Sequence, residues 1–231
     1  MIIFPWVKKI RREIEFWWFY KSFYQKFTFY TTKNPDELDE LHRLRYQVYI
    51  EEYKYIDKNL SENGREKDNW DSFSVHFVIR DLKKEIAATV RLILDSPNGF
   101  PIEKHFNIDI NVNNYQRNES AEISRLIVAK EFRRHHLMLV LIKGIFLYVK
   151  KHNIKNIFSV MDERLLPVVL KIGIPFKKIG QPSLYQGLTF PCILSVKDFE
   201  VSLQRNNPRL FMYLQDATIK FDEQKKGYSI S

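Results

Sequence analysis

Residues 122–128, Glu122-Ile123-Ser124-Arg125-Leu126-Ile127-Val128, form a short predicted strand that carries an acid and an arginine among apolar side chains. A basic turn and a long apolar helix follow, the helix at about residues 134–151. Burying a carboxylate and a guanidinium in a strand incurs a desolvation cost that a purely structural strand avoids. We therefore expect this strand to serve chemistry, and the chain to be an enzyme.

Other predicted elements surround this strand on both sides. Asn34-Pro35 is a strong helix start, and that helix runs to about residue 50. The remaining predictions are strands at 27–31, 75–79, 86–94, 156–161, 175–179 and 188–196, and helices at 163–172, 197–204 and 208–221. This order predicts a mixed α/β sheet flanked by helices.

Alternation along the strands predicts which side chains share a face. In residues 86–94, Arg91 points away from the main apolar row. In the strand at 121–128, strict alternation places Glu122 and Ser124 on one face and Arg125 on the other. A β-bulge would bring the three side chains closer together.

Composition fits a globular protein with one main domain. The chain has 231 residues, 45% of them hydrophobic, and a formal charge of +9, which favours an anionic partner. Cys192 is the only cysteine, so no internal disulfide forms and a reducing compartment is expected. Its apolar neighbours make Cys192 a core residue rather than a nucleophile.

Residues 1–26 are predicted to form a basic, aromatic helical arm, separate from a domain at 27–231. The arm either packs on its own domain as a lid or lies in a membrane interface. Its apolar part precedes its basic part, which reverses the order of a secretory signal. The apolar run 137–149 is too short to span a bilayer. We expect a cytoplasmic protein, with peripheral contact at the inner face of the membrane as the alternative to a wholly cytoplasmic one.

Several charged motifs recur in order along residues 27–205. They are Leu44-Arg45-Tyr46-Gln47-Val48-Tyr49, the pair Asp68 and Asp71 before Ser74-Val75-His76-Phe77, Thr89-Val90-Arg91-Leu92, Glu122-Ile123-Ser124-Arg125-Leu126, Val160-Met161-Asp162-Glu163-Arg164-Leu165-Leu166 and Phe176-Lys177-Lys178-Ile179-Gly180. This pattern resembles the autoinducer-synthase group of the GNAT acyltransferases, and most closely its N-acyl amino acid synthase and exosortase (PEP-CTERM) system-associated relatives.

The resemblance implies a mostly antiparallel, twisted sheet with a splayed central cleft. It also implies transfer of an acyl group, expected to be long, from acyl carrier protein or coenzyme A to the amine of an amino acid or related small acceptor. The thioester is a substrate, and no bound cofactor or metal is expected. In such proteins the residues matching Arg45, Asp68, Asp71, Arg91, Glu122 and Arg125 hold the amino-terminal part against the sheet and build the acceptor pocket.

The residue types suit this chemistry. Glu122, with its pKa raised by burial, is the first candidate to take the amine proton. Backbone N–H groups at a bulge around Ser124–Leu126 would polarise the carbonyl, and Arg91 or Arg125 would grip an acceptor carboxylate. Ser124 and Arg125 join Glu122 as catalytic candidates, and Tyr49 and Tyr55 are either core or tunnel wall or acceptor contacts. Candidate donor-binding residues are Leu126, Val128, Arg133 and Arg134.

The turn before the long helix departs from coenzyme-A-using GNAT proteins. Residues 133–138, Arg133-Arg134-His135-His136-Leu137-Met138, contain no glycine to bring backbone N–H groups to a pyrophosphate. From Lys130 to Lys155, seven lysines and arginines stand against one acidic residue, Glu131. This balance favours an acidic acyl carrier protein as donor and partner.

Other interpretations stay open. Glu122 and Arg125 could form only a structural ion pair, and Asp68 and Asp71 could be solvated turn residues. The rival functions are a conventional acetyl-coenzyme A acetyltransferase and a non-catalytic lipid- or protein-binding module. Nucleic acid is not an expected partner, because the basic residues follow no recognition motif.

Overall fold

The computed structural model describes residues 23, 25–61, 63–109, 115–184, 187–216 and 222–223. The predicted arm lies almost entirely outside this part of the chain. The division at residues 26 and 27 therefore stays a prediction.

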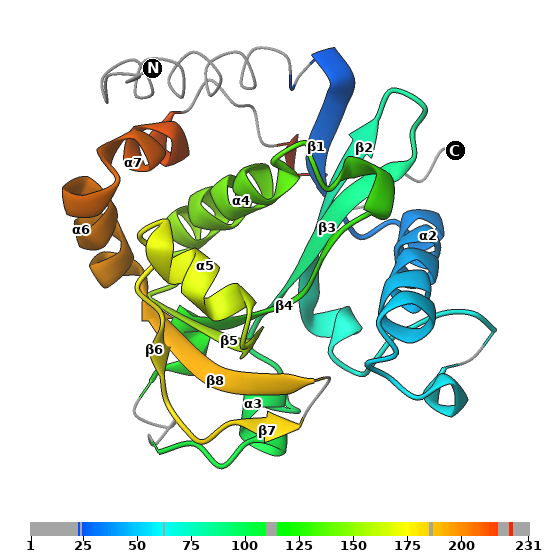
Figure 1. Cartoon of the computed structure of the whole chain (residues 1–231), viewed down its shortest axis with the longest axis horizontal. Helices are drawn as coiled ribbons and strands as arrows, with labels where there is room; N and C mark the ends of the chain where they lie inside the picture. Colours follow the sequence, from blue (N-terminus) through cyan, green and yellow to red (C-terminus); the bar gives the residue numbers. More distant parts are fainter. Residues whose placement is uncertain are drawn as a thin grey trace, which may run out of the picture.

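A single sheet forms the centre of the described structure (Figure 1). Its path is β6-β8-β5-β4-β3-β2-β1-β9, and β7 pairs with β8 off this path. All pairs are antiparallel except β4 with β5 and β1 with β9. The expected mixed, mostly antiparallel sheet is confirmed. The strands are β1 (Phe27–Thr32), β2 (Ser74–Asp81), β3 (Ile86–Ile93), β4 (Ser120–Val128), β5 (Asn156–Asp162), β6 (Lys177–Lys178), β7 (Ser183–Leu184), β8 (Leu188–Ser195) and β9 (Asp222–Glu223).

Helices cover both faces of this sheet. The larger apolar core joins one face to α4 (Leu137–Lys151), α5 (Leu165–Lys171), α6 (Val196–Asn206) and α7 (Pro208–Gln215). A smaller core joins the opposite face to α3 (Pro101–His105), with Ile93 and Phe158 contributed by the strands. On that same face α2 (Pro35–Tyr46) reaches the sheet through Glu40, which accepts from Arg80 of β2. We call these the α4 face and the α2 face.

The start of α2 follows its sequence signal. The side chain of Asn34 accepts from the backbone N–H groups of Asp36 and Glu37, and Pro35 occupies the first helical position. Beyond Tyr46 the chain continues as a π-helix, η1 (Gln47–Glu52), which the sequence did not indicate. This wider turn changes the direction of the tyrosines that follow.

Other boundaries differ from prediction. Helix α4 begins at Leu137 rather than near 134, because His136 adopts the left-handed region with φ 53°. The strand predicted at 175–179 is reduced to β6, and α7 ends at Gln215 rather than 221. Helix α3 and strand β7 were not predicted, since five and two residues are too short to show a period.

Strand β4 carries a β-bulge. Ser124 pairs with Arg91 and Ile127 with Thr89, so Arg125 and Leu126 together oppose one residue of β3. Arg125 takes the left-handed φ of 53° that the extra residue requires. As a result, Ile123 before the bulge and Leu126 after it both pack on the α4 face. Strict alternation therefore fails here, and Arg125 lies on the α2 face with Ser124.

Strands β4 and β5 separate just before this bulge. Their parallel pairing covers Ser120 to Ile123 on β4 and Asn156 to Ser159 on β5, and both strands then continue unpaired with each other. The separation opens the middle of the sheet. The splayed cleft expected from the resemblance is present.

Helix α4 crosses the sheet at very short range. A Cβ added at Gly144 would lie 2.1 Å from Phe29 Cζ and 3.2 Å from Phe77 Cδ1. The absence of a side chain at this position therefore sets the distance between α4 and strands β1 and β2.

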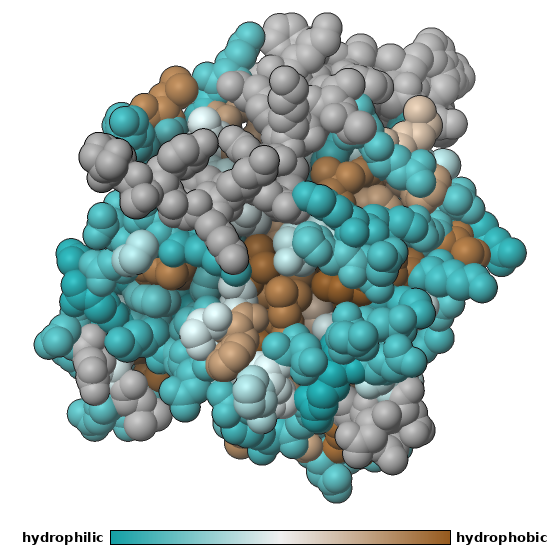
Figure 2. All heavy atoms as spheres, turned by 180° about the vertical axis from the view of Figure 1, so that it is seen from behind, coloured by the Kyte–Doolittle hydropathy of each residue, from teal (hydrophilic) through white to brown (hydrophobic). Residues whose placement is uncertain are grey.

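The surface is mainly polar. On the face shown in Figure 2, polar residues surround an apolar area near the middle. Within the described residues, no helix has both the length and the apolar character needed to cross a membrane.

Candidate active site

A cavity of about 540 Å³ lies where β4 and β5 part. Its polar lining belongs to the α2 face and includes Asp68, Arg91, Glu122 and Ser124. Most of its apolar lining belongs to the α4 face and includes Met138, Ile142, Ile145, Val149, Ile157, Val169, Leu194 and Phe199. The cavity thus passes through the sheet and has one polar end and one apolar end.

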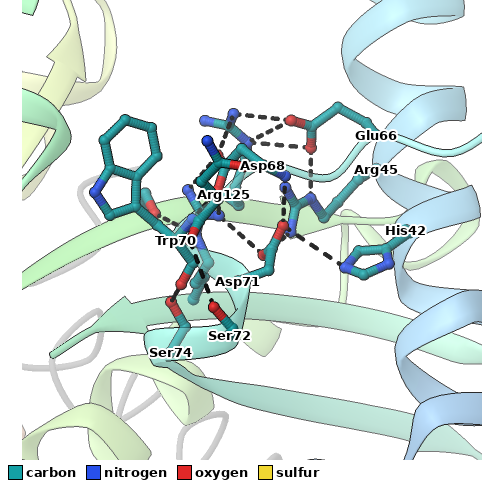
Figure 3. A network of polar contacts seen from close by, with 12 residues as sticks. His42, Arg45, Glu66, Asp68, Trp70, Asp71, Ser72, Ser74 and Arg125 are labelled. Atoms are coloured by element: carbon teal, nitrogen blue, oxygen red, sulfur yellow. Dashed lines mark hydrogen bonds and ion pairs between the residues drawn. The ribbon is translucent and has the colours of Figure 1, made fainter. Parts of the chain in front are cut away.

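Two arginines and Glu66 connect α2 to the edge of the cavity (Figure 3). Arg45 reaches from α2, and its Nε and Nη1 donate to Glu66 Oε2 at 2.5 Å and Asp71 Oδ1 at 2.6 Å. From the bulge, Arg125 Nη2 donates to Glu66 Oε1 at 2.8 Å and Asp68 Oδ2 at 3.3 Å. The loop carboxylates therefore join a helix to the sheet.

Arg91 completes this charged cluster from β3. Its Nη1 and Nη2 donate to Asp68 at 2.6 and 2.9 Å, Nη1 also donates to Asp71 at 2.9 Å, and Nε donates to Ser124 Oγ at 2.9 Å. Arg45, Asp68, Asp71, Arg91, Ser124 and Arg125 are thus brought together as the sequence motifs predicted. The two aspartates are not solvated turn residues.

Sequence reasoning missed Glu66. Burial alone would raise its pKa, but Arg125 and Arg45 lower the pKa to about 2. In the same way Arg45 and Arg91 outweigh burial and hold the pKa of Asp71 far below its usual value. The available signal was an acid two positions before Asp68, which gives the loop three carboxylates for three arginines. Glu66 and Asp71 are therefore ionised and paired with arginines.

Glu122 lies beside the cluster but in a different electrostatic state. It is buried, and its Oε2 accepts the backbone N–H of Ile102, at the start of α3, at 3.0 Å. Burial raises the pKa of Glu122 to about 8, against the opposing effects of the Ile102 N–H and Arg91. At neutral pH this carboxyl can hold a proton or release it, which suits an acid–base group.

Two predicted tyrosines line the cavity between the bulge and β5. The hydroxyl of Tyr49 donates to the Leu126 carbonyl at 3.4 Å, and its ring lies 5.5 Å from Arg125 Cζ. The ring centroids of Tyr49 and Tyr55 are 6.4 Å apart. Tyr55 also contacts Asp162 on β5, so these rings form one continuous wall.

The predicted donor-binding residues lie in two groups. Leu126 lines the cavity at the bulge, and Val128 lies at the end of β4, where its carbonyl accepts from Arg133 Nε at 3.2 Å. Arg133 also forms a two-pronged ion pair with Glu52, at 2.6 and 2.7 Å. Arg134 is exposed in the turn before α4. Cys192 is buried, and burial raises the pKa of its thiol to about 12, as expected for a core residue.

The sheet opens between two central strands, one of these strands carries a bulge, and a cavity lies at the opening. Together these features define the GNAT class of fold. The family model for N-acyl amino acid synthase FeeM matches residues 40–198, which contain the whole charged cluster. The chain therefore belongs to the N-acyl amino acid synthase FeeM family.

Individual relatives agree with this assignment. An L-ornithine N(alpha)-acyltransferase of Agrobacterium fabrum (strain C58 / ATCC 33970) is 28% identical over 131 residues. The match covers 52% of this chain, and the chain spans 45% of the length of that curated relative.

Solved structures share the fold. A CoA-dependent acyl-homoserine lactone synthase, BjaI, has a TM-score of 0.64 at 20% identity, covering 78% of this chain and 89% of that one. FeeM, from uncultured soil microbes, has a TM-score of 0.61 at 14% identity, covering 76% and 94%. A GNAT acetyltransferase of Staphylococcus aureus Mu50 has a TM-score of 0.50 at 15% identity, covering 74% and 99%.

Proposed function

We propose that this chain is an N-acyltransferase that moves an acyl group from a thioester to the amine of an amino acid. One observation carries the proposal: the cavity crosses the sheet between β4 and β5, with a polar end on the α2 face and an apolar end on the α4 face. An amino acid fits the polar end, and a hydrocarbon chain fits the apolar end. The reacting groups would meet at the bulge between them.

The chemistry needs no covalent enzyme intermediate. The amine nitrogen attacks the thioester carbonyl carbon, the N–C bond forms, and the carbonyl electrons move to oxygen. Backbone N–H groups of the Ser124–Leu126 segment would stabilise this oxyanion, a contribution typically of about 3 kcal/mol. Glu122, as carboxylate, accepts the amine proton, and it returns a proton to the thiolate when the C–S bond breaks.

The size of the apolar end supports a long acyl group. A long hydrocarbon chain would find apolar contacts along α4, α5, β5 and α6, and each buried CH₂ contributes about 0.8 kcal/mol. An acetyl group would leave most of this lining without a partner. We therefore favour a long-chain acyltransferase over a conventional acetyltransferase.

For the donor we propose a phosphopantetheine thioester on acyl carrier protein. The turn before α4 lacks glycine, and His136 occupies the left-handed position that a glycine would usually take. The excess of lysine and arginine around α4 would attract an acidic carrier. Coenzyme A thioesters are the alternative donor.

Thiol release tests the proposed function directly. The full chain is given acyl carrier protein or coenzyme A carrying long acyl groups, or acetyl-coenzyme A, together with a panel of amino acids that includes ornithine. Thiol should appear only when both a long-chain donor and an amino acid are present, and mass spectrometry should find the amide. The proposal fails if every pair is silent.

Two further proposals concern the surroundings of the enzyme. For residues 1–26 we propose either packing on their own domain as a lid or contact with a membrane surface, and liposome sedimentation of the full chain and of a chain lacking them would distinguish the two. The exosortase association implied by the sequence motifs also remains a proposal. Genetic linkage between this chain and an exosortase in one host would test it.

A further inference from the structure

The cavity needs a group that recognises the carboxylate of an amino acid acceptor. Among the described residues that line it, three are cations: Arg91, Arg125 and Arg164. The side chains of Arg91 and Arg125 are only 1% and 10% exposed, whereas that of Arg164 is 74% exposed. Accessibility therefore favours Arg164.

The bonding of Arg91 and Arg125 points the same way. Both Nη atoms and the Nε of Arg91 already donate to Asp68, Asp71 and Ser124. The Nε and Nη2 of Arg125 donate to Glu66, and Nη2 also donates to Asp68. At Arg91 a substrate carboxylate would have to displace these buried carboxylates, at a large cost in unpaired charge. Arg125, like Arg164, keeps Nη1 for another acceptor, but the side chain of Arg125 is buried and that of Arg164 faces solvent. For the gripping role that the sequence suggested for Arg91 or Arg125, accessibility favours Arg164.

Arg164 is held in one orientation at the end of β5. Its Nε donates to Asp162 Oδ1 at 3.0 Å, and its Nη2 donates to Asp162 Oδ2 and to the Tyr55 hydroxyl, both at 2.9 Å. The backbone N–H of Arg164 also donates to Asp162 Oδ1, at 2.8 Å. Asp162 and Tyr55 thus fix an arginine that faces solvent. A pre-oriented guanidinium loses less entropy when it binds a planar anion.

An aromatic wall connects Arg164 with the bulge. Arg164 bonds the hydroxyl of Tyr55, Tyr55 faces Tyr49, and Tyr49 reaches the Leu126 carbonyl. All three residues and Leu126 line the same cavity. An acceptor held by Arg164 would therefore lie against these tyrosines, inside the cavity that Glu122 also lines.

We propose that Arg164 binds the acceptor carboxylate, with Asp162 and Tyr55 as positioning residues. This inference rests on the proposed function, and it names the group that makes an amino acid, rather than a simple amine, the preferred acceptor. Binding forms charge-assisted hydrogen bonds and changes no covalent bond.

Matched acceptors test the proposal. The KM and kcat of the full chain are measured for an amino acid and for its carboxamide, which keeps the amine and side chain but lacks the negative charge. For Arg164→Gln, we expect the KM of the acid to rise roughly ten- to hundredfold and that of the amide to change less than about threefold. The kcat should be retained with both acceptors.

Two further variants sharpen this measurement. Tyr55→Phe keeps the ring and removes the hydroxyl, so the KM of the acid alone should rise by about three- to tenfold. Arg43→Gln is the control: Arg43 is also an exposed arginine paired with an aspartate, but it lies on α2 outside the cavity. Arg43→Gln should change the KM of neither acceptor.

Each outcome has a clear meaning. Equal effects of Arg164→Gln on acid and amide, or none on either, would overturn the inference. A rise in the KM of the donor instead would also overturn it, and would assign Arg164 to a donor phosphate. If the unaltered chain is inactive with every donor and acceptor, the proposed function fails first, independently of Arg164.

Discussion

Glu66 illustrates how much of this site depends on single charges. One carboxylate binds an arginine from α2 and another from the β4 bulge, which are 80 positions apart along the chain (Arg45 and Arg125). Such a pair is costly to bury but far more costly to break, because the remaining partner keeps its charge without water. The cluster therefore fixes geometry more than it adds stability.

Replacing Arg45 measures that dependence. Arg45→Ala leaves Glu66 and Asp71 each with one fewer cation in a buried setting, so the free energy of unfolding should fall by about 3–5 kcal/mol. Urea denaturation followed by circular dichroism gives the value. Arg43→Ala breaks an exposed pair with Asp39, and its effect should stay below about 1 kcal/mol. Similar losses in both variants would contradict the role assigned to the cluster.

A variant of Glu122 distinguishes a catalytic role from a structural one. Glu122→Gln is neutral and can still accept from the Ile102 N–H, so it resembles the protonated carboxyl in the fold. We expect kcat to fall by roughly 10²–10⁴ while the free energy of unfolding at pH 7 is retained or rises. Comparable losses of activity and stability would instead favour a purely structural role for Glu122.

The pH dependence of stability checks the same residue. The pKa of Glu122 is raised to about 8 from 4.5, so its contribution to stability is complete below pH 4.5 and is lost as pH rises through 8. Glu122→Gln lacks this loss, and its stability relative to the unaltered chain should increase between pH 5 and pH 9. A constant difference in urea midpoint across this range would rule out the raised pKa.

At the scale of elements, the sequence predicted the charged motifs, the start of α2 and the order of helices and strands along the chain, because caps, alternation and apolar runs are local signals. Local signals alone do not mark the bulge, since Arg125 offers no glycine at its left-handed position, and it was expected around Ser124–Leu126 only from the family resemblance. The same reason hides the late start of α4 at His136. Glu66 and Arg164 were missed because their importance comes from partners distant in sequence.

Gly144 tests the packing of α4 on the sheet. In an exposed helix an alanine would be more stable than glycine by about 1 kcal/mol. Here the added methyl would overlap the ring of Phe29, so Gly144→Ala should destabilise the fold by about 1–3 kcal/mol. Thermal or urea unfolding gives the sign. Stabilisation would mean that α4 does not approach β1 this closely.

At the scale of the whole molecule, the loop that carries Glu66, Asp68 and Asp71 joins α2 to strands β3 and β4, which border the cavity. Its carboxylates stabilise the fold only while ionised. The pKa of Glu66 is lowered to about 2 from 4.5, so its contribution is present above pH 4.5 and is lost as pH falls toward 2. Burial lowers the pKa of His76 to about 4, which adds a loss that begins below pH 6.5.

Acid titration of a variant isolates the loop. Glu66→Gln should be clearly less stable than the unaltered chain at pH 7, because Arg45 and Arg125 lose a negative partner. The difference should shrink as pH falls from 4.5 toward 2, where the native carboxyl becomes protonated as well. Urea midpoints measured from pH 7 to pH 3 give this comparison, and a difference independent of pH would contradict it.

If the chain has the proposed function, the opening between β4 and β5 also determines how two substrates share the protein. An acyl thioester and an amino acid that enter from opposite faces of the sheet would not compete for space. Neither would have to leave before the other enters. Initial rates plotted as double reciprocals should therefore give intersecting lines, the pattern of a ternary complex. Parallel lines would reveal an acylated protein between two half-reactions.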